Sequence, residues 1–502
     1  MKTGRDYKFW FCTGSQDLYG DECLAHVAEH SAIMVEGLNK SGILPFEVVL
    51  KPTLLTNEMI RKTFNEANAD EDCAGVITWM HTFSPAKSWI LGLQEYRKPL
   101  LHLHTQFNQE IPYDTIDMDF MNEYQSAHGD REYGHIVSRM GIERKVIMGF
   151  WDDKNVQERI ASWMRTAVGV MESSHIRVMR IADNMRNVAV TEGDKVEAQI
   201  KFGWEVDAYP VNEIAEAVEQ VSKGDIDALV EEYYDKYDIL LEGRDAAEFK
   251  KHVAVQAGIE IGFERFLEEK NYQAIVTHFG DLGSLKQLPG LAIQRLMEKG
   301  YGFGAEGDWK TACLYRTLWV MNQGLEKGCS FLEDYTLNFA ADRTSSLHSH
   351  MLEVCPLIAS DKPKLEVHFL GIGIRKQQTA RLVFTSKTGK GVKATVVDLG
   401  NRFRLIASEV ECIEPKAMPK LPVASALWVP QPTFEIGAGA WILAGGTHHS
   451  AFSYDITAEY WEDFCEILGI EFVNIDKNTT ISSFKQQLRN NEIYYMLNKA
   501  LR

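Results

Sequence analysis

Four short segments of the chain carry carboxylate and imidazole side chains that could bind a cation or transfer protons. They are residues 304–310, 330–335, 347–353 and 444–450. Carboxylates suit manganese or magnesium, and imidazole widens the choice toward cobalt or zinc. Each segment by itself is a weak signal, and the pattern alone does not show that these distant residues converge.

Each segment also has an ordinary structural explanation. Glycines around Glu306 and Asp308 let the backbone approach a ligand closely, but the same acidic pair would cap a helix N-terminus. Glu333 could be a solvated carboxylate beside buried neighbours. His348 and His350 would face the same side of an extended chain, although this short pattern is common. Taken alone, the first segment favours the helix start.

A competing set of histidines lies in the first third of the chain. His102 and His104 sit on a predicted strand, with His81 on the preceding βα unit and His128 further on. Parallel strands end at ligand clefts, so these side chains could bind a metal or a substrate. Histidines at the edge of a core, bonded to the backbone, explain them equally well. Because no carboxylate shares their pattern, we rank this set below the carboxylate–histidine segments.

The elements that must position these groups begin with short apolar strands that alternate with amphipathic helices. Strands are predicted at residues 9–13, 46–50, 73–79 and 100–104, with a helix at 22–38. Parallel strands need long crossovers, so this alternation indicates βαβ units. A second segment of the same kind begins near residue 176, with predicted elements at 176–181, 245–268 and 274–277.

The texture changes from about residue 364, where alternating strands are separated by glycine and lysine turns. These strands are predicted at residues 364–369, 380–384, 393–397 and 403–407. They indicate an antiparallel sheet or a small barrel. We therefore predict an N-terminal α/β domain at 1–175, a central α/β domain at 176–326 and a C-terminal β-rich domain at 327–502.

Composition excludes several classes of protein. Lysine and arginine total 53 against 71 for aspartate and glutamate, and this net charge of −18 argues against general nucleic-acid binding, which rests on phosphate neutralisation. The eight cysteines contain no CxxC pair, and their low density fits reduced thiols. No secretory leader and no run of about 18 apolar residues occurs. We expect a cytoplasmic enzyme with no membrane partner.

The sequence resembles the L-arabinose isomerase family along nearly its whole length. The matching peptides are distinctive and follow one another in the family's order, which makes the match highly specific. They span residues 13–20, 81–87, 104–108, 116–122, 190–195, 285–291, 306–310, 330–335, 350–356 and 445–449.

The resemblance implies roles for individual residues. Glu306, Glu333, His350 and His449 match the positions that hold the family's divalent metal, and the two glutamates also match its proton-transfer residues. The metal is expected to be Mn²⁺, with Co²⁺ or Mg²⁺ as substitutes. Other positions match the sugar pocket, namely Gln16, Leu18, Phe83, Met185, Phe279, Met351, Ile372 and His448, with His128 as a contribution from an adjacent chain.

The resemblance also implies a fold and a reaction. The fold is of the fucose isomerase type, with two doubly wound parallel α/β domains followed by an antiparallel, barrel-like β domain. The reaction converts L-arabinose to L-ribulose, and D-galactose to D-tagatose, by metal-assisted transfer of protons through an ene-diol. Family members form homo-hexamers or homo-tetramers with active sites near subunit interfaces, and we expect the same assembly here.

Two residues depart from the family pattern, and two other functions are kept open. Asp17 stands where family members usually have histidine, and His348 where they have glycine. Both flank predicted site residues, so we expect them to affect the metal, the sugar or the pH response without changing the reaction. The alternatives are a ketol isomerase for L-fucose or a related sugar, and a sugar-binding regulator without catalysis. A regulator would need no complete set of metal ligands.

Overall fold

The computed structural model describes residues 5–369 and 376–500 of the chain. The chain divides into two compact units, of which one ends at Met171 and the other begins at Glu172. Ile372, predicted to line the sugar pocket, lies outside the described residues. None of the helices in the described part of the chain combines the length and the apolar composition that crossing a bilayer requires.

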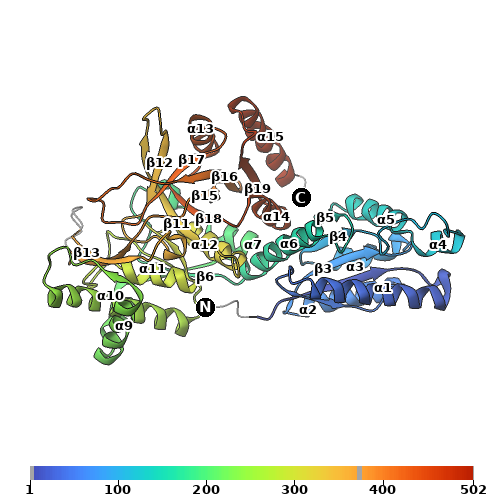
Figure 1. The fold of residues 1–502 in the computed structure, drawn as a ribbon, viewed down its shortest axis with the longest axis horizontal. Coiled ribbons are helices and arrows are strands. Elements are labelled where there is room, and N and C mark those ends of the chain that lie inside the picture. Colours follow the sequence, from blue (N-terminus) through green and yellow to red (C-terminus); the bar gives the residue numbers. More distant parts are fainter. Residues whose placement is uncertain (1–4, 370–375, 501–502) are drawn as a thin grey trace. The chain divides into compact units, whose positions relative to one another are not determined.

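The N-terminal unit contains a five-stranded parallel sheet in the order β2-β1-β3-β4-β5 (Figure 1). All eight residues of β3 are buried, which explains why this strand is mostly apolar and does not alternate between apolar and polar residues. The strands are β1 (Lys8–Gly14), β2 (Glu47–Leu50), β3 (Cys73–Met80), β4 (Leu100–His104) and β5 (Lys145–Met148).

Helices connect these strands, as the alternating pattern predicts. Phe64, Leu93 and Tyr133 come from three of the helices and pack in one buried cluster with Trp10 and Val76 of the sheet. The helices of the unit are α1 (Gly20–Lys40), α2 (Asn57–Ala69), α3 (Ile90–Glu95), α4 (Met118–Glu123), α5 (Ser126–Arg139) and α6 (Lys154–Ser173), with short 3-10 turns η1 (Asp17–Tyr19) and η2 (Ala86–Trp89).

The second unit begins with a four-stranded parallel sheet in the order β10-β9-β6-β7. Its strands are β6 (Arg177–Ile181), β7 (Glu205–Tyr209), β9 (Ala274–Val276) and β10 (Gly302–Gly304). Its helices are α7 (Lys195–Phe202), α8 (Val211–Glu219), α9 (Lys223–Lys236), α10 (Ala246–Lys270), α11 (Gly290–Lys299) and α12 (Trp309–Met321), with η3 (Ala189–Thr191). Every residue of α12 is buried, because this helix packs against β9 and β10 and also against strands of the β-rich part.

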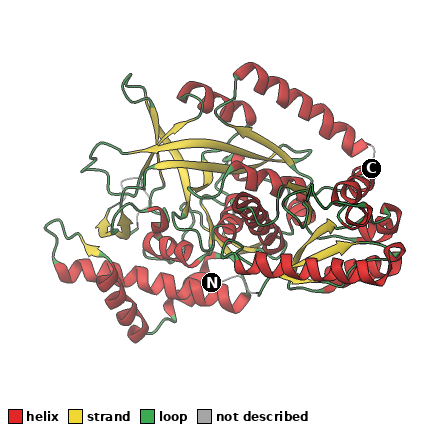
Figure 2. Cartoon of the chain, turned by 45° about the vertical axis from the view of Figure 1, so that its right-hand side comes forward, coloured by secondary structure: helices red, strands yellow, loops and turns green. Residues whose placement is uncertain are grey.

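A seven-stranded sheet in the order β15-β18-β11-β12-β17-β16-β19 forms most of the β-rich part (Figure 2). β15 also pairs with β16, which closes six of the strands into an antiparallel barrel and leaves β19 as a parallel addition. The strands are β11 (Cys329–Asn338), β12 (Ser345–Ser349), β15 (Gly389–Asp398), β16 (Phe403–Ile413), β17 (Ala426–Pro430), β18 (His449–Ser453) and β19 (Glu471–Ile475). The helices are α13 (Phe434–Ala444), α14 (Ala458–Leu468) and α15 (Ile481–Ala500), with η4 (Pro356–Ile358).

The predicted fold class, two parallel α/β regions and a barrel-like β region, is confirmed. Two of the predicted strands lie outside the barrel, however. β13 (Lys364–His368) and β14 (Thr379–Val383) form a separate small sheet with β8 (Asp238–Ile239). β13 pairs in parallel with β8, a strand from the central region, and a partner so distant in sequence leaves no local pattern.

Candidate functional site

Three neighbouring strands of the barrel bring predicted metal ligands together. Glu333 on β11 lies opposite His449 on β18 and opposite Ser349 on β12. Residues opposite each other in an antiparallel pair share a face, so Glu333 and His449 point the same way. His350 follows β12 directly, and its Nε2 lies 3.6 Å from Glu333 Oε2. One ligand atom from each of Glu333, His350 and His449 lies within 4.8 Å of the other two.

Glu306 reaches the same place from a tight turn between β10 and α12. Its φ is 58° and that of Gly307 is 92°, and a left-handed conformation at a residue with a side chain costs roughly 1–2 kcal/mol. Its Oε2 lies 3.3 Å from Nε2 of His448, which donates to it. Glu306, His448 and His449 form a second group with ligand atoms within 4.8 Å of one another. His449 therefore belongs to both groups.

A carboxylate orients each of the two histidines that are predicted metal ligands, His350 and His449. His449 Nδ1 donates to Asp308 Oδ2 at 3.0 Å, and His350 Nδ1 donates to a carboxylate oxygen of Glu353. Nδ1 therefore holds the proton in each ring, and Nε2 keeps its lone pair. Carboxylates behind metal-binding histidines commonly set the tautomer in this way.

His449 Nε2 is buried and has no hydrogen-bond partner among the described residues. Leaving a buried polar atom unpaired costs roughly 1–3 kcal/mol, unless a ligand engages its lone pair. Two imidazoles and two carboxylates form the mixed nitrogen and oxygen donor set that a divalent cation of the manganese type accepts. The residues present thus fit a bound divalent metal.

Asp308 has two roles at the start of α12. It is the N-cap of the helix, where Oδ1 accepts from the backbone N–H of Thr311 at 3.2 Å, and Oδ2 accepts from the Thr311 hydroxyl at 2.7 Å. Burial opposes its charge, but Lys310 and His449 hold the pKa of its carboxyl well below the usual range. The predicted capped helix start is confirmed, and the same carboxylate also orients a predicted metal ligand.

The ionisable groups of the site shift one another's pKa values. The hydrogen bond from His448 lowers the pKa of Glu306, against the effect of burial, and His449 lowers it further. The same hydrogen bond raises the pKa of His448. Burial opposes a charge on His350, yet Glu353 and Glu333 raise its pKa above the usual value. Glu306 is therefore ionised at neutral pH, as a general base requires.

Four of the predicted sugar-pocket residues lie in the second unit. His448 and Met351 directly adjoin His449 and His350, and the backbone N–H of Met185 donates to the carbonyl of Glu306 at 2.9 Å. Met185 also lines a hollow of about 650 Å³. Phe279 lies between two of the other lining residues, which are Ala182, Asp183, Asn184, Arg186, His278, Gly280 and Asp281. This hollow opens after β6 and β9, where ligand clefts of parallel sheets form.

The other predicted pocket residues belong to the N-terminal unit. Gln16 and Leu18 follow β1, and Leu18 is 82% exposed. Phe83 follows β3, and its ring centroid lies 4.5 Å from that of His128. These residues gather beyond the carboxyl ends of two adjacent strands. Their part in a sugar pocket, including the contribution of His128 to an adjacent chain, stays a prediction.

The competing histidines have a structural explanation. Nε2 of His102 and Nδ1 of His104 lie 2.9 Å and 2.7 Å from the two oxygens of Asp130, a buried carboxylate that also accepts from the N–H of Met80. The sequence pattern shows no carboxylate near these histidines, because Asp130 lies on α5 and only packing brings it to β4. Across the described residues, the groups that could hold a metal are the two already named.

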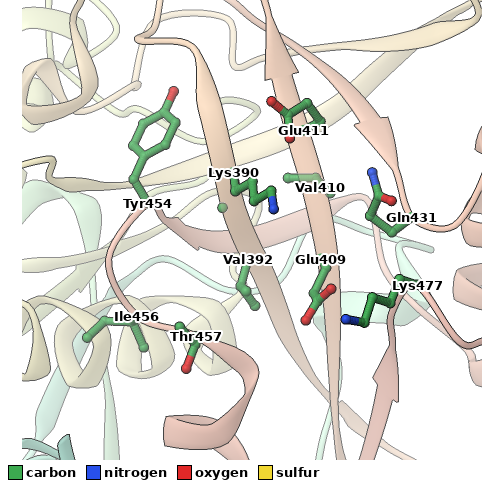
Figure 3. Close-up of a pocket in the computed structure, with 11 residues that line it drawn as sticks. Lys390, Val392, Glu409, Val410, Glu411, Gln431, Tyr454, Ile456, Thr457 and Lys477 are labelled. Carbon is green, nitrogen blue, oxygen red and sulfur yellow. The ribbon is translucent and has the colours of Figure 1, made fainter. Parts of the chain in front are cut away.

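A further hollow of about 470 Å³ lies on the barrel at β15 and β16 (Figure 3). Lys390 and Glu411 face each other across these strands, with Glu409 and Lys477 nearby. None of the predicted site residues lines it. It also lacks histidine and does not resemble the carboxylate–imidazole site in chemistry.

Sequence reasoning missed Asp308 and Glu353 as residues that orient histidines. A local signal existed for Glu353, which follows His350 by three residues, whereas Asp308 lies 141 residues before His449. The spacing did not reveal which ring nitrogen each carboxylate would contact. For Asp308, that assignment depended on the packing of α12 beside β18.

Comparisons with known proteins agree along the chain. Family profiles for the N-terminal, central and C-terminal domains of L-arabinose isomerase match residues 3–175, 177–324 and 328–471. An L-arabinose isomerase of Phocaeicola vulgatus is 61% identical over 502 residues, covering 99% of this chain and 98% of the relative. One of Geobacillus thermodenitrificans is 55% identical over 496 residues, covering 99% of each.

A solved structure of a periplasmic sugar-binding protein of a transporter from Legionella pneumophila also matches. It has 11% identity and a TM-score of 0.14, with 64% of this chain and 96% of that one covered. A TM-score this low carries no information about the fold.

Proposed function

The chain belongs to the L-arabinose isomerase family, and we propose that its carboxylate–histidine site performs the family's reaction by proton transfer between two glutamates and the sugar. The reaction is the isomerisation of the aldose L-arabinose to the ketose L-ribulose. One observation carries the residue assignment, namely the convergence of ligand atoms from Glu333, His350 and His449 within 4.8 Å, with Glu306 in an overlapping group.

The resident cation we propose is Mn²⁺, with Co²⁺ or Mg²⁺ as substitutes. Glu306, Glu333, His350 and His449 would hold it, and the unpartnered Nε2 of His449 supports this assignment. When bound, a divalent cation polarises the sugar's carbonyl oxygen and stabilises the negative charge of an ene-diolate. Asp308 keeps the Nε2 lone pair of His449 available as a ligand.

The two glutamates perform the proton transfers in this proposal. Isomerisation removes the proton from C2, delivers a proton to C1 and moves a hydroxyl proton from O2 to O1. One glutamate acts as the base at carbon and the other as the acid at oxygen, and the roles exchange when the reaction reverses. Positioned groups of this kind typically contribute about 10²–10⁴-fold each. His448 donates to Glu306 and so keeps that carboxylate ionised.

We also propose D-galactose as a second substrate, converted to D-tagatose, because it shares the configuration of L-arabinose at C2, C3 and C4. The proposed assembly is a homo-hexamer or homo-tetramer in which His128 serves a neighbouring subunit. A cytoplasmic location is supported by the eight cysteines, all of which are free thiols within the described residues.

The decisive experiment measures ketose formation from L-arabinose by chelated protein, with and without added Mn²⁺. Activity that returns with the metal supports the assigned site and the cation together. Activity that survives chelation contradicts the metal proposal. Absence of ketose from folded protein under both conditions contradicts the proposed site chemistry, and L-fucose and related sugars would then be assayed as substrates.

Heavy water separates the two routes for hydrogen. Solvent deuterium at C1 of the product supports the ene-diol route through Glu306 and Glu333. Product without deuterium at C1 would indicate a hydride shift and would remove the proton-transfer role from the glutamates.

A further inference from the structure

A charged cluster lies inside the barrel, directly behind the proposed site. Lys393 Nζ donates to Asp334 Oδ2 at 2.9 Å, and Nδ1 of His348 lies 2.9 Å from Asp334 Oδ1. The His348 ring stacks on Trp428 with centroids 3.7 Å apart. The side chains of Lys393 and His348 are 4% and 0% exposed. The cluster therefore consists of a buried ammonium and a buried imidazole that both contact a carboxylate whose side chain is 30% exposed.

The strand register places this cluster and the metal ligands on opposite faces of the same sheet. Asp334 lies opposite His348, whereas Glu333 lies opposite His449. Successive side chains of a strand point to opposite faces. Glu333 therefore faces the proposed site while Asp334, the next residue, points into the barrel toward Lys393.

Glu333 pairs on both sides, but the strand loses its regular register with β12 just beyond it. The register between β11 and β12 shifts between Asp334 and Thr336. Such an irregularity interrupts the ladder and re-aims the neighbouring side chains. On the other side of β11, the N–H of Asp334 donates to the carbonyl of His448 at 2.9 Å. The carboxylate of Asp334 adds a side-chain contact to β11 at this point.

Lys393 is also connected to the segment that carries His449. Its Nζ lies 4.0 Å from the ring centroid of Trp441, whose Nε1 donates to the carbonyl of Thr447 at 3.0 Å. The Thr447 hydroxyl donates in turn to the carbonyl of His449 at 2.6 Å. The Lys393 ammonium therefore contacts Asp334, which adjoins Glu333, and Trp441, which is linked through Thr447 to His449.

We propose that Lys393 is a positioning residue that acts from inside the barrel, through Asp334 and Trp441, to hold Glu333 and His449 at ligand distance. This inference rests on the proposed function, because it assigns Lys393 to the support of that site. His348 completes the cluster by contacting the second oxygen of Asp334. Lys393 touches neither the sugar nor the metal in this arrangement.

The test is Lys393→Met, which keeps the length of the side chain and removes its charge. The matched control is Lys390→Met on the same strand, an exposed lysine for which the described residues provide no hydrogen bond or ion pair. We expect Lys393→Met to bind Mn²⁺ at least tenfold more weakly, measured by titration calorimetry on chelated protein. At saturating Mn²⁺, kcat should fall while KM for L-arabinose changes less than threefold. In Lys390→Met, the Mn²⁺ affinity, kcat and KM for L-arabinose should stay within twofold of those of the unmodified (parent) protein.

A purely structural role gives a different result. Phe263→Leu, a buried change on α10, should lower the melting temperature and leave Mn²⁺ affinity unchanged. If Lys393→Met loses melting temperature but binds Mn²⁺ like the parent, the inference is wrong. Should Lys393→Met not fold, Asp334→Asn and Lys393→Arg replace it. The inference is supported if Asp334→Asn binds Mn²⁺ more weakly than the unmodified protein and Lys393→Arg, which keeps the charge, binds it more tightly than Asp334→Asn does. It is overturned if Asp334→Asn binds Mn²⁺ as tightly as the unmodified protein.

The parent protein distinguishes this inference from the proposed function. If the parent does not bind Mn²⁺ or does not form ketose, the proposed site itself is wrong. If the parent does both and Lys393→Met matches it, only the role of Lys393 is wrong.

Discussion

Asp308→Asn is the sharpest test of how the proposed metal ligands are oriented. Both oxygens of Asp308 accept hydrogen bonds, Oδ1 from the N–H of Thr311 and Oδ2 from the Thr311 hydroxyl and from His449 Nδ1. Asparagine offers one oxygen and one NH₂ group, so one of these positions must receive a donor instead of an acceptor. One orientation of the amide predicts a loss of stability, and the other predicts a loss of Mn²⁺ affinity.

If the NH₂ group replaces Oδ1, it faces the N–H of Thr311 and weakens the helix cap. Loss of an N-cap typically costs about 0.5–2 kcal/mol of stability. If it replaces Oδ2, it faces Nδ1–H of His449, which then favours the tautomer with the proton on Nε2 and loses its ligand lone pair. Changes to such carboxylate partners typically weaken metal binding by about 10–100-fold. We therefore expect Mn²⁺ affinity to fall by about tenfold or more, with a modest loss of stability.

The matched control is Asp245→Asn. Asp245 caps α10 by accepting from the N–H groups of Ala247 and Glu248, and its carboxylate contacts no proposed metal ligand. This variant should lose stability without losing Mn²⁺ affinity. Titration calorimetry on chelated protein and thermal melting measure the two effects separately. Asp308→Asn with parent-like Mn²⁺ affinity would refute the claim that Asp308 sets the tautomer of His449.

Glu306→Gln and Glu333→Gln should each lower kcat by at least about 10²-fold with unchanged circular dichroism, since each removes a proton-transfer group; near-normal turnover in either variant would remove that residue from the mechanism. Gly307→Ala should lower the melting temperature and kcat, because φ at this residue is +92° and a Cβ would lie 2.4 Å from Asn184 Cα; unchanged values would contradict the required turn. Burial lowers the pKa of His81 from 6.5 to about 4, so the folded state disfavours its charged form. Its contribution to stability is complete above pH 6.5 and is lost as the pH falls toward 4, by up to about 1.4 kcal/mol per pH unit. Urea unfolding at pH 7.5 and 5 should show a smaller pH effect in His81→Gln, and an equal effect would contradict this reasoning.

Local patterns predicted the parallel α/β regions well because the physical cause is local. A parallel strand covered by helices on both faces is buried throughout and mostly apolar, and all residues of β3 are buried. The predicted helix at 245–268 corresponds to α10 (Ala246–Lys270) for the same reason, since its periodic apolar residues meet the core. The domain boundaries at residues 176 and 327 remain predictions.

Pairing partners could not be predicted in the same way. Alternation marked residues 364–369 and 380–384 as strands, but it did not show that they would join β8 rather than the barrel. Alternation reports which face of a strand is buried and contains nothing about which strand lies beside it. The closure of the barrel by β15 and β16 likewise depends on contacts between whole strands.

The sequence by itself determined the kinds of donor in the site and, through the family resemblance, which residues to expect there. It also determined that Asp308 suits a helix start, since capping depends on neighbours within a few residues. Tertiary structure decided the rest. Asp308 and His449 are 141 residues apart, and only the packing of α12 beside β18 lets one carboxylate cap a helix and leave Nε2 of that histidine free. The same dependence on distance explains why His102 and His104 are bonded to Asp130, because hydrogen bonds form between atoms that folding brings together, whatever their separation in the chain.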